Sequence, residues 1–399
     1  MKFLHHFRQT PQKPTAYSLV DIGRDTVKAV VVLAVPGQAA VQVVGYGLAN
    51  TGGRDIAGGR LEADATYGPV NAALIQAEDS TEHFIGRKVV PDDVIFSLPG
   101  RATLGRLFTV RQTRAHPQKG VSAGEVRALH SRAERLVRRG LADQPADSRQ
   151  WQPLAVSEAG LFLDRRLVVG PEGLLGEELC LSVFGAAGLA AALRALNVLA
   201  NRLEVAVDNI ITAPQALAVA SPEEEAVLLD IGLGETEIYL IRSNGLVAAD
   251  RIPFGGRFFT HALAQALDMP AEDAEGLKRA YAAGGLSAEE TWAVDRLLAE
   301  ARRRWYTALL DTLQAMSARV AAQNDIYDRP LPRKIFLTGG GSLLPGLDVL
   351  LRASTAPFDA APDVAHLGPG VLPNIQDLTD GLDYTLFLPA LCLTAGLPD

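Results

Sequence analysis

The chain carries one local pattern twice: a run of apolar residues, then Asp-Ile-Gly, then a second β-rich run. Residues 21–28 read Asp-Ile-Gly-Arg-Asp-Thr-Val-Lys, and residues 230–237 read Asp-Ile-Gly-Leu-Gly-Glu-Thr-Glu. Apolar runs of this length on either side of a glycine turn are typical of a β-hairpin. Two such hairpins in one chain predict a duplicated fold whose two halves face a shared cleft.

A third glycine motif follows near the end of the chain. Residues 334–347 read KIFLTGGGSLLPGL, which predicts a strand, a glycine triplet at Gly339–Gly341 and then a helix. Glycine lets a backbone approach a phosphate closely, and an aspartate at a hairpin mouth can hold hydrated Mg2+. The triplet offers a flat surface for a base and ribose. The three motifs together favour a nucleotide site.

Size and composition limit the class of protein. A chain of 399 residues predicts at least two lobes, and 48% apolar with 21% charged residues is typical of a globular protein. The net charge of -8 argues against non-specific nucleic-acid binding. No apolar stretch is long enough for a transmembrane helix, and residues 1–16 lack the apolar core of a secretory signal. We therefore expect a cytoplasmic protein with a flexible N-terminal tail and two free, buried cysteines, Cys180 and Cys392.

Two helices with many arginines are expected between the motifs. Residues 122–140 begin with the capping-box spacing of Ser122 and Glu125 and carry five arginines on the polar face. That face is either simply solvated or a docking surface for an acidic partner. Residues 288–325 predict a long charged helix in which Arg302–Arg304 are solvated.

The three motifs in this order resemble the actin-like ATPase superfamily, which includes actin, DnaK-type chaperones, sugar kinases, MreB, FtsA and PilM. The resemblance runs from about residue 17 to 396. It implies an α/β fold: an actin-like (ribonuclease H-like) duplicated fold with two lobes around a nucleotide cleft. An α+β unit inserted after the first helical segment resembles the extra subdomain of FtsA and PilM. The Asp21-to-Lys28 spacing resembles PilM, whereas the run GLLGEEL at 173–179 and the chain length resemble FtsA, so we favour a divergent bacterial FtsA.

This resemblance implies a division of the chain into eight segments. They are a flexible tail (1–16), the first-lobe core (17–92), the inserted α+β subdomain (93–205), a return to the first lobe (206–224), the second-lobe core (225–260), a second-lobe helical subdomain (261–330), more second-lobe core (331–365) and a C-terminal return to the first lobe (366–399).

The resemblance and the needs of a nucleotide site together give candidate residues for ATP and Mg2+. The phosphate-binding candidates are Gly23, Arg24, Lys28, Gly232 and Gly234, and Asp21 and Asp230 would hold Mg2+ through water. The nucleoside-binding candidates are Glu275, Lys278, Arg279, Gly340, Gly341 and Ser342. Lys28 on an alternating strand could instead face solvent. Helical spacing puts Glu275 beside both basic residues, which is also the pattern of an ordinary surface ion pair.

Departures from the family pattern argue against fast hydrolysis. Arg24 stands where family members place Ser or Thr, and it either holds phosphate or fills the pocket. Leu233 and Glu235 replace a glycine and a threonine of the second turn. Ala213 stands where a water-orienting Gln or Glu is expected, and Gln215 follows two residues later. We expect ATP binding with at most weak hydrolysis and name no catalytic residue; a pseudo-ATPase that keeps only the fold is the alternative.

Three functions remain open from the sequence. The first is an FtsA-like adaptor that assembles head-to-tail and links filaments of an FtsZ-like tubulin homologue to other division proteins, with peripheral membrane association as an option. The second is a PilM-like cytoplasmic scaffold of type IV pilus assembly that binds the tail of an inner-membrane protein. The third is a small-molecule kinase, which needs a further catalytic aspartate that we do not find.

Overall fold

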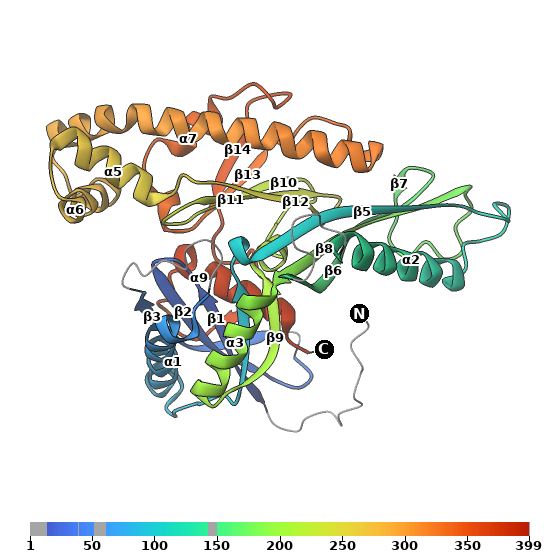
Figure 1. The fold of residues 1–399 in the computed structure, drawn as a ribbon, viewed down its shortest axis with the longest axis horizontal. Coiled ribbons are helices and arrows are strands. Elements are labelled where there is room, and N and C mark those ends of the chain that lie inside the picture. Colours follow the sequence, from blue (N-terminus) through green and yellow to red (C-terminus); the bar gives the residue numbers. More distant parts are fainter. Residues whose placement is uncertain (1–13, 39, 52–60, 143–149, 399) are drawn as a thin grey trace. The chain divides into compact units, whose positions relative to one another are not determined.

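The computed structural model describes residues 14–38, 40–51, 61–142 and 150–398, which form two compact units (Figure 1). Unit 1 comprises residues 1–222, 245–247 and 368–399, and unit 2 comprises 223–244 and 248–367. The expected loop at 52–60 and most of the expected tail lie outside the described residues. The first strand begins at Thr15, two residues before the expected start of the core.

Unit 1 contains a six-stranded sheet in the order β15-β3-β2-β1-β4-β9. Its strands are β1 (Thr15–Ile22), β2 (Thr26–Ala34), β3 (Val41–Asn50), β4 (Asp93–Leu98), β9 (Ala206–Thr212) and β15 (Ile375–Asp377). The helices α1 (Ala63–Ile85) and α3 (Ala190–Leu203) bury Val70, Leu74 and Leu196 against it. The helix α4 (Ala213–Ala218) follows β9 directly, and the last helix, α9 (Tyr384–Leu391), contacts β1 and β2.

A second, antiparallel sheet in unit 1 has the order β5-β8-β6-β7. Its strands are β5 (Thr103–Thr113), β6 (Trp151–Leu163), β7 (Arg166–Leu167) and β8 (Glu178–Leu189). The helix α2 (Ala123–Ala142) packs on this sheet through Leu129, Ala133 and Val137. The capping box is confirmed, because the Glu125 N–H donates to Ser122 Oγ and the Ser122 N–H donates to Glu125 Oε2.

The extent of the second sheet differs from the expected insert of 93–205. Strand β4 pairs in parallel with both β1 and β9, so it is a central strand of the first sheet. The apolar stripe of α3 also belongs to the core beneath the first sheet. Residues 103–189 alone build the second sheet and its helix. Both ends of the expected insert therefore pack with the first sheet, because their apolar faces are buried there.

Unit 2 contains a five-stranded sheet in the order β12-β11-β10-β13-β14. Its strands are β10 (Ala226–Ile231), β11 (Thr236–Arg242), β12 (Gly245–Ile252), β13 (Lys334–Thr338) and β14 (Asp363–His366). The first three residues of β12 are grouped with unit 1. Its helices are α5 (Gly256–Leu267), α6 (Ala271–Ala282), α7 (Ala288–Gln323) and α8 (Leu347–Arg352). The expected helix after the glycine triplet is broken: a 3-10 turn at Gly340–Leu343 precedes Pro345-Gly346, and α8 begins only after that glycine.

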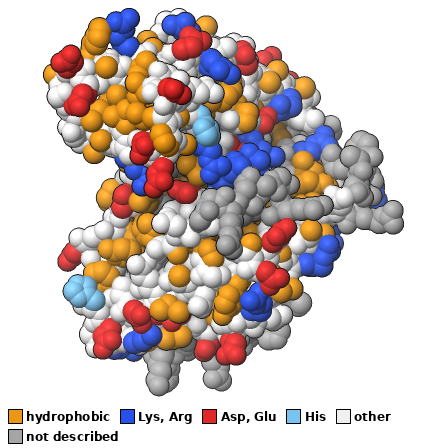
Figure 2. All heavy atoms as spheres, turned by 60° about the vertical axis from the view of Figure 1, so that its left-hand side comes forward, with side chains coloured by type: hydrophobic (Ala, Val, Ile, Leu, Met, Phe, Trp, Pro, Cys, Tyr) orange, Lys and Arg blue, Asp and Glu red, His pale blue; other side chains and the backbone are white. Residues whose placement is uncertain are grey.

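The surface and the cysteines agree with a globular chain. On the face drawn in Figure 2, hydrophobic, acidic and basic side chains are interspersed. Cys180 and Cys392 are free and buried, as expected. None of the helices in the described part of the chain is long and apolar enough to span a membrane.

The expectation that Arg302–Arg304 are all solvated is wrong for Arg302. Its side chain is 7% exposed, and it donates hydrogen bonds to Pro345 O at 2.9 Å and to Asp295 Oδ1 at 2.7 Å. Arg302 lies one helical turn after Leu298 on the buried face of α7. Its guanidinium therefore holds the turn before α8 against the long helix, whereas Arg303 is 71% exposed.

We predict that Arg302→Ala lowers the free energy of unfolding by about 2–3 kcal/mol, because it leaves the carbonyl of Pro345 without its donor and removes buried packing. Arg303→Ala is the matched control and should change stability by less than about 0.5 kcal/mol, since exposed ion pairs contribute little. Urea unfolding of both variants measures the difference. Equal stabilities for the two would contradict this account of Arg302.

Candidate functional site

The two Asp-Ile-Gly turns have the same backbone hydrogen bond. The Gly23 N–H donates to Thr26 O at 3.0 Å, and the Gly232 N–H donates to Glu235 O at 3.0 Å. The first turn joins β1 to β2 and the second joins β10 to β11, both antiparallel pairs. The predicted hairpins are confirmed, and each lies within its own unit.

In the first turn, the aspartate faces a lysine across the hairpin. Asp21 is paired in register with Lys28, and their side chains form an ion pair at 2.9 Å. The two side chains are 11% and 13% exposed, so Lys28 does not point freely into solvent. A Cβ added at Gly23 would lie 3.2 Å from Lys28 Nζ. The structure thus brings together Asp21, which is predicted to hold Mg2+, and Gly23 and Lys28, which are predicted to bind phosphate.

In the second turn, the equivalent position holds another carboxylate. Asp230 is paired in register with Glu237, which accepts a hydrogen bond from the Tyr239 hydroxyl at 2.5 Å. Burial and the nearby charge of Asp230 raise the pKa of Glu237 to about 7. Among the described residues, no three acidic, histidine or cysteine side chains converge closely enough to bind a metal ion directly. A role for Asp230 through bound water therefore stays a prediction.

The glycine triplet packs directly on the second turn. A Cβ added at Gly339, where φ is +81°, would lie 2.2 Å from Asp230 Oδ1, and one at Gly341 would lie 2.7 Å from Ile231 O. This contact follows from the sheet, because β10 and β13 are parallel neighbours with Asp230 opposite Thr338. Only residues without a side chain fit at this distance. Gly339 and Gly341 are thus required by the packing of the triplet on the second turn.

The start of α5 also contacts the second turn. The Gly256 N–H donates to Gly232 O at 2.8 Å, and the Arg257 N–H donates to Leu233 O at 2.7 Å. A Cβ at Gly255 would lie 2.5 Å from Gly232 O. Sequence reasoning did not include this glycine pair among the site residues, although two glycines directly before a helix were a usable signal.

The predicted Glu275, Lys278 and Arg279 group forms a network that reaches α5. Lys278 Nζ donates to Glu275 Oε2 at 2.7 Å, to Thr260 Oγ1 at 2.8 Å and to Gly256 O at 3.0 Å. Arg279 Nε donates to Glu275 Oε1 at 2.8 Å. Burial acts to raise the pKa of Glu275, but the hydrogen bonds from these neighbours outweigh it and lower the pKa to about 2.

This network answers whether Glu275, Lys278 and Arg279 form only an ordinary surface ion pair. Lys278 is 12% exposed and joins two helices, so the group is more than a surface ion pair. Arg279, at 70% exposure, is the member whose side chain projects outward. Thr260 completes the network and was missed, because nothing in its local sequence marks it. Contact of this group with a nucleoside remains a prediction.

The remaining predicted residues have varied surroundings. Ser342 is buried, and its hydroxyl donates to Gly339 O at 2.7 Å within the same 3-10 turn. The carbonyl of Arg24 accepts a hydrogen bond from the Thr51 hydroxyl at 2.7 Å. Ala213 begins α4, as expected, and Gln215 donates to Ser157 Oγ at 3.3 Å. The side chain of Gln215 is thus engaged within unit 1.

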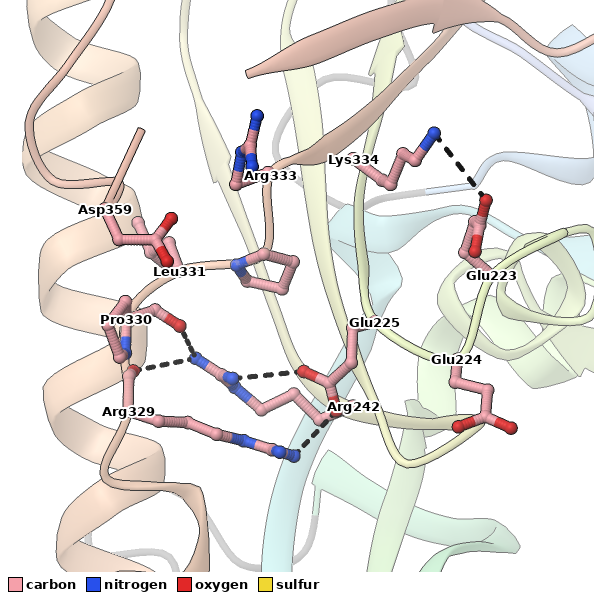
Figure 3. A pocket seen from close by; sticks show the side chains of 11 residues that line it. Glu223, Glu224, Glu225, Arg242, Arg329, Pro330, Leu331, Arg333, Lys334 and Asp359 are labelled. Atoms are coloured by element: carbon pink, nitrogen blue, oxygen red, sulfur yellow. Dashed lines mark hydrogen bonds and ion pairs between the residues drawn. The ribbon is translucent and has the colours of Figure 1, made fainter. Parts of the chain in front are cut away.

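A separate hollow lies at the other end of the unit 2 strands (Figure 3). It is lined mainly by charged residues: Glu223, Glu224, Glu225, Arg242, Arg329, Arg333, Lys334 and Asp359. Arg242 is 1% exposed and donates to Glu225 Oε2 at 3.1 Å and to Pro330 O at 2.9 Å. Burial lowers the pKa of Arg242. No predicted site residue lines this hollow. Arg242 connects the end of β11 to the segment before β13.

Comparison with known proteins finds similarity to FtsA proteins and to a solved structure with the same fold. A family model described as Cell division protein FtsA matches residues 227–369. FtsA of Streptococcus pneumoniae is 25% identical over 82% of this chain and 71% of its own length, and FtsA of Rhizobium meliloti is 27% identical over 48% of each chain. A solved PilM–PilN type IV pilus biogenesis complex aligns with a TM-score of 0.61 and 17% identity over 98% of this chain and 100% of the other. The chain is thus similar to FtsA proteins in sequence and to the PilM structure in fold.

The similarity to FtsA includes the second of the two turns. The match to the FtsA model covers the second turn, helices α5–α7 and the glycine triplet, which are the segments that meet in unit 2. The likeness to the PilM structure, at 17% identity, establishes the fold alone. The predicted actin-like α/β fold is confirmed, whereas the roles of individual site residues remain proposals.

We predict that Glu237 makes stability fall as pH rises from about 5 to 8. Its folded pKa of about 7 lies above the unfolded value of 4.5, so the folded state holds the proton more tightly. The resulting contribution is complete below the unfolded pKa and is lost as pH rises through the folded one. Its size is about 1–3 kcal/mol for this half-buried group.

Glu237→Gln should remove this pH dependence while keeping the shape of the side chain. Denaturant unfolding at pH 5 and pH 8 with a chelator present measures this dependence. The free energy of unfolding of the variant should rise relative to that of the wild type at the higher pH. Glu300→Gln, on the exposed surface of α7, is the control and should shift stability equally at both values. If the free energies of unfolding of wild type and Glu237→Gln differ by the same amount at both pH values, the assigned pKa is contradicted.

Proposed function

We propose that the protein is an FtsA-like bacterial cell-division adaptor that binds ATP with Mg2+ between its two lobes. The observation that carries this proposal is the match of residues 227–369 to the FtsA family model, supported by the FtsA relatives. The matched region contains the second hairpin turn, the glycine triplet and the Glu275 network. In this proposal the adaptor links filaments of an FtsZ-like protein to other division-site proteins.

The phosphates of the nucleotide would lie against the two glycine turns. Gly23, Gly232 and Gly234 allow close approach of the backbone, and Lys28 supplies a positive charge beside the first turn. Mg2+ would be held through water by Asp21 and Asp230. A bound cation would also relieve the repulsion between the carboxylates of the second turn, which supports a metal on that side.

The nucleoside would lie against the Glu275 network and the glycine triplet. Arg279 is the exposed basic member, whereas Lys278 uses its three donors within the protein. Gly340 and Gly341 would cover the base. Ser342 would stabilise its own 3-10 turn rather than contact the ligand, since its hydroxyl donates a hydrogen bond to Gly339 O.

Slow or absent hydrolysis is part of the proposal. In-line attack on a γ-phosphate needs a positioned water. Ala213 has no group that can orient water, and the side chain of Gln215 is hydrogen-bonded to Ser157 and Thr212. ATP would then act as a switch for head-to-tail assembly into a homopolymer. The adaptor would work in the cytoplasm, peripherally at the inner face of the cell membrane.

A PilM-like scaffold of type IV pilus assembly is the second candidate. The PilM–PilN structure has the same fold over the full chain, but shared fold does not transfer a partner. Co-sedimentation with polymerised FtsZ separates the two: the division adaptor should pellet with the filaments, and a pilus scaffold should stay in the supernatant.

We predict that ATP with Mg2+ binds with micromolar affinity and that Asp230→Ala weakens binding by about tenfold or more, because a carboxylate that positions the metal is lost. Isothermal titration calorimetry measures both. Asp348→Ala, on the surface of α8, is the control and should bind as wild type. Absence of binding by the wild-type protein would overturn the nucleotide switch and leave a pseudo-ATPase.

A further inference from the structure

A groove rich in arginine lies between α2 and β5. Seven residues line it, and we call it the arginine groove: Thr109, Val110, Arg111, Arg132, Arg135, Leu136 and Arg139. The four helical members follow the spacing i, i+3, i+4 and i+7, so they form one stripe along α2. The groove therefore presents three arginines of one helix face beside a fourth on the strand.

The groove follows the outer edge of β5. Val110 belongs to the core between the sheet and α2, whereas Thr109 lies on the opposite face, where its hydroxyl contacts Ser182 at 3.1 Å. Both line the groove, so the groove passes along the side of the strand. Strand β5 is the end of its sheet, with β8 as its neighbour in the described part of the chain. An edge strand directs half of its N–H and C=O groups outward, where another strand can pair with them.

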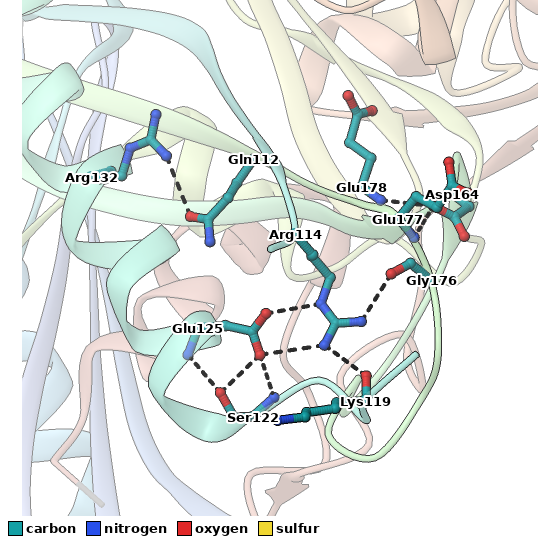
Figure 4. A network of polar contacts seen from close by, with 10 residues as sticks. All are labelled: Gln112, Arg114, Lys119, Ser122, Glu125, Arg132, Asp164, Gly176, Glu177 and Glu178. Carbon is teal, nitrogen blue, oxygen red and sulfur yellow. Dashed lines mark hydrogen bonds and ion pairs between the residues drawn. The ribbon is translucent and has the colours of Figure 1, made fainter. Parts of the chain in front are cut away.

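Buried hydrogen bonds fix α2 relative to β5 (Figure 4). Arg114, whose side chain is 1% exposed, follows the end of β5 and donates to Glu125 Oε1 at 2.9 Å in the first turn of α2. It also donates to the carbonyls of Gly176 and Lys119, both at 2.9 Å. Farther along the helix, Arg132 donates to Gln112 Oε1 at 3.3 Å. The groove is thus formed before any partner binds, which lowers the entropic cost of binding.

Among the described residues, the groove's arginines on α2 make no ion pair, whereas the one on β5 does. Arg111 pairs with Glu178 at 3.0 Å, and Arg132 contacts an uncharged amide. Arg135 and Arg139 are exposed and make no hydrogen bond or ion pair with any described residue. The whole chain carries a net charge of -8, so this stripe is a local reversal of sign. Such a reversal favours a partner with carboxylates.

We propose that the arginine groove binds an acidic peptide segment of a partner protein in an extended conformation. The segment pairs as an added strand with the outer edge of β5, and its carboxylates contact Arg132, Arg135 and Arg139. This inference does not depend on nucleotide binding or on a role in division. It rests on three features that coincide: an open strand edge, unpaired arginines beside it and a fixed helix.

The dimensions suit a short segment. Arg132 and Arg139 are separated by a rise of roughly 10 Å along the helix. Three residues of an extended chain cover about 10 Å, and alternate side chains point to the same face. Acidic residues at every second position would therefore face the helix stripe. The apolar side chains of Val110 and Leu136 offer contact for the intervening residues.

An anionic lipid surface is the competing occupant and is less well matched. Lipid headgroups would form ion pairs with the arginines. They would not supply a row of backbone hydrogen-bond partners for the outward N–H and C=O groups of β5. A groove along a strand edge also suits an inserted chain better than a flat surface. The two occupants give opposite results in the experiment below.

The test uses the full chain and a fluorescein-labelled peptide of alternating Glu and Val. Fluorescence anisotropy at low salt should show saturable binding to wild type, and R135E/R139E should weaken it by at least about tenfold. The matched control R194E/R303E changes the net charge equally at exposed arginines outside the groove and should bind as wild type. Thermal unfolding of both double variants checks that the fold is kept, which is expected because all four side chains are exposed.

Two further probes test the mode of binding. A peptide with Gln in place of Glu should not bind, and a peptide N-methylated at alternate residues should bind at least about tenfold more weakly, because it cannot donate to β5. Failure of wild type to bind the acidic peptide, or equal loss in R194E/R303E, would overturn the proposal. So would full affinity of the N-methylated peptide, or binding to phosphatidylserine vesicles that the acidic peptide does not displace.

Discussion

The backbone contact between the glycine triplet and the second hairpin turn is the constraint on which the rest of unit 2 depends. A side chain at Gly339 would occupy the place of Asp230 Oδ1. The contact is possible because β10 and β13 are adjacent and parallel and end at the same edge of the sheet. The first N–H groups of α5 bind the carbonyls of the same turn, and Lys278 then ties α6 to α5. One tightly packed turn thus orients the glycine triplet, α5 and, through α5, α6.

The duplication of the fold preserves the backbone and changes the charge. Both turns contain the same glycine hydrogen bond, but the residue opposite the aspartate is Lys28 in one and Glu237 in the other. The first turn is therefore internally neutralised, whereas the second collects negative charge and raises the pKa of Glu237. Two carboxylates in register repel each other, whereas a carboxylate and an ammonium group attract each other. Two hairpins with the same backbone pattern thus differ in the charge beside the turn.

Arginine has three distinct roles in this chain, and its surroundings decide which. Arg302 and Arg242 are buried and bind backbone carbonyls, so they hold segments together. Arg114 binds a helix-capping carboxylate and fixes α2. Arg135 and Arg139 are exposed and have no such neighbours among the described residues. The sequence next to each arginine does not show which of these roles it has.

The sequence by itself determined the features that depend on neighbours a few residues apart. Both hairpins, the capping box of α2 and the contact of Glu275 with Lys278 and Arg279 follow from turn chemistry and helical spacing, and the order of the motifs was enough for the fold family. The tertiary structure decided what depends on distant partners. It placed β4 and α3 with the first sheet, buried Arg302 beneath Pro345 and brought Thr260 into the Glu275 network. It also made β5 the end strand of its sheet in the described part of the chain. The physical reason is that burial and strand neighbours are set by the whole chain, so the local pattern of residues does not contain them.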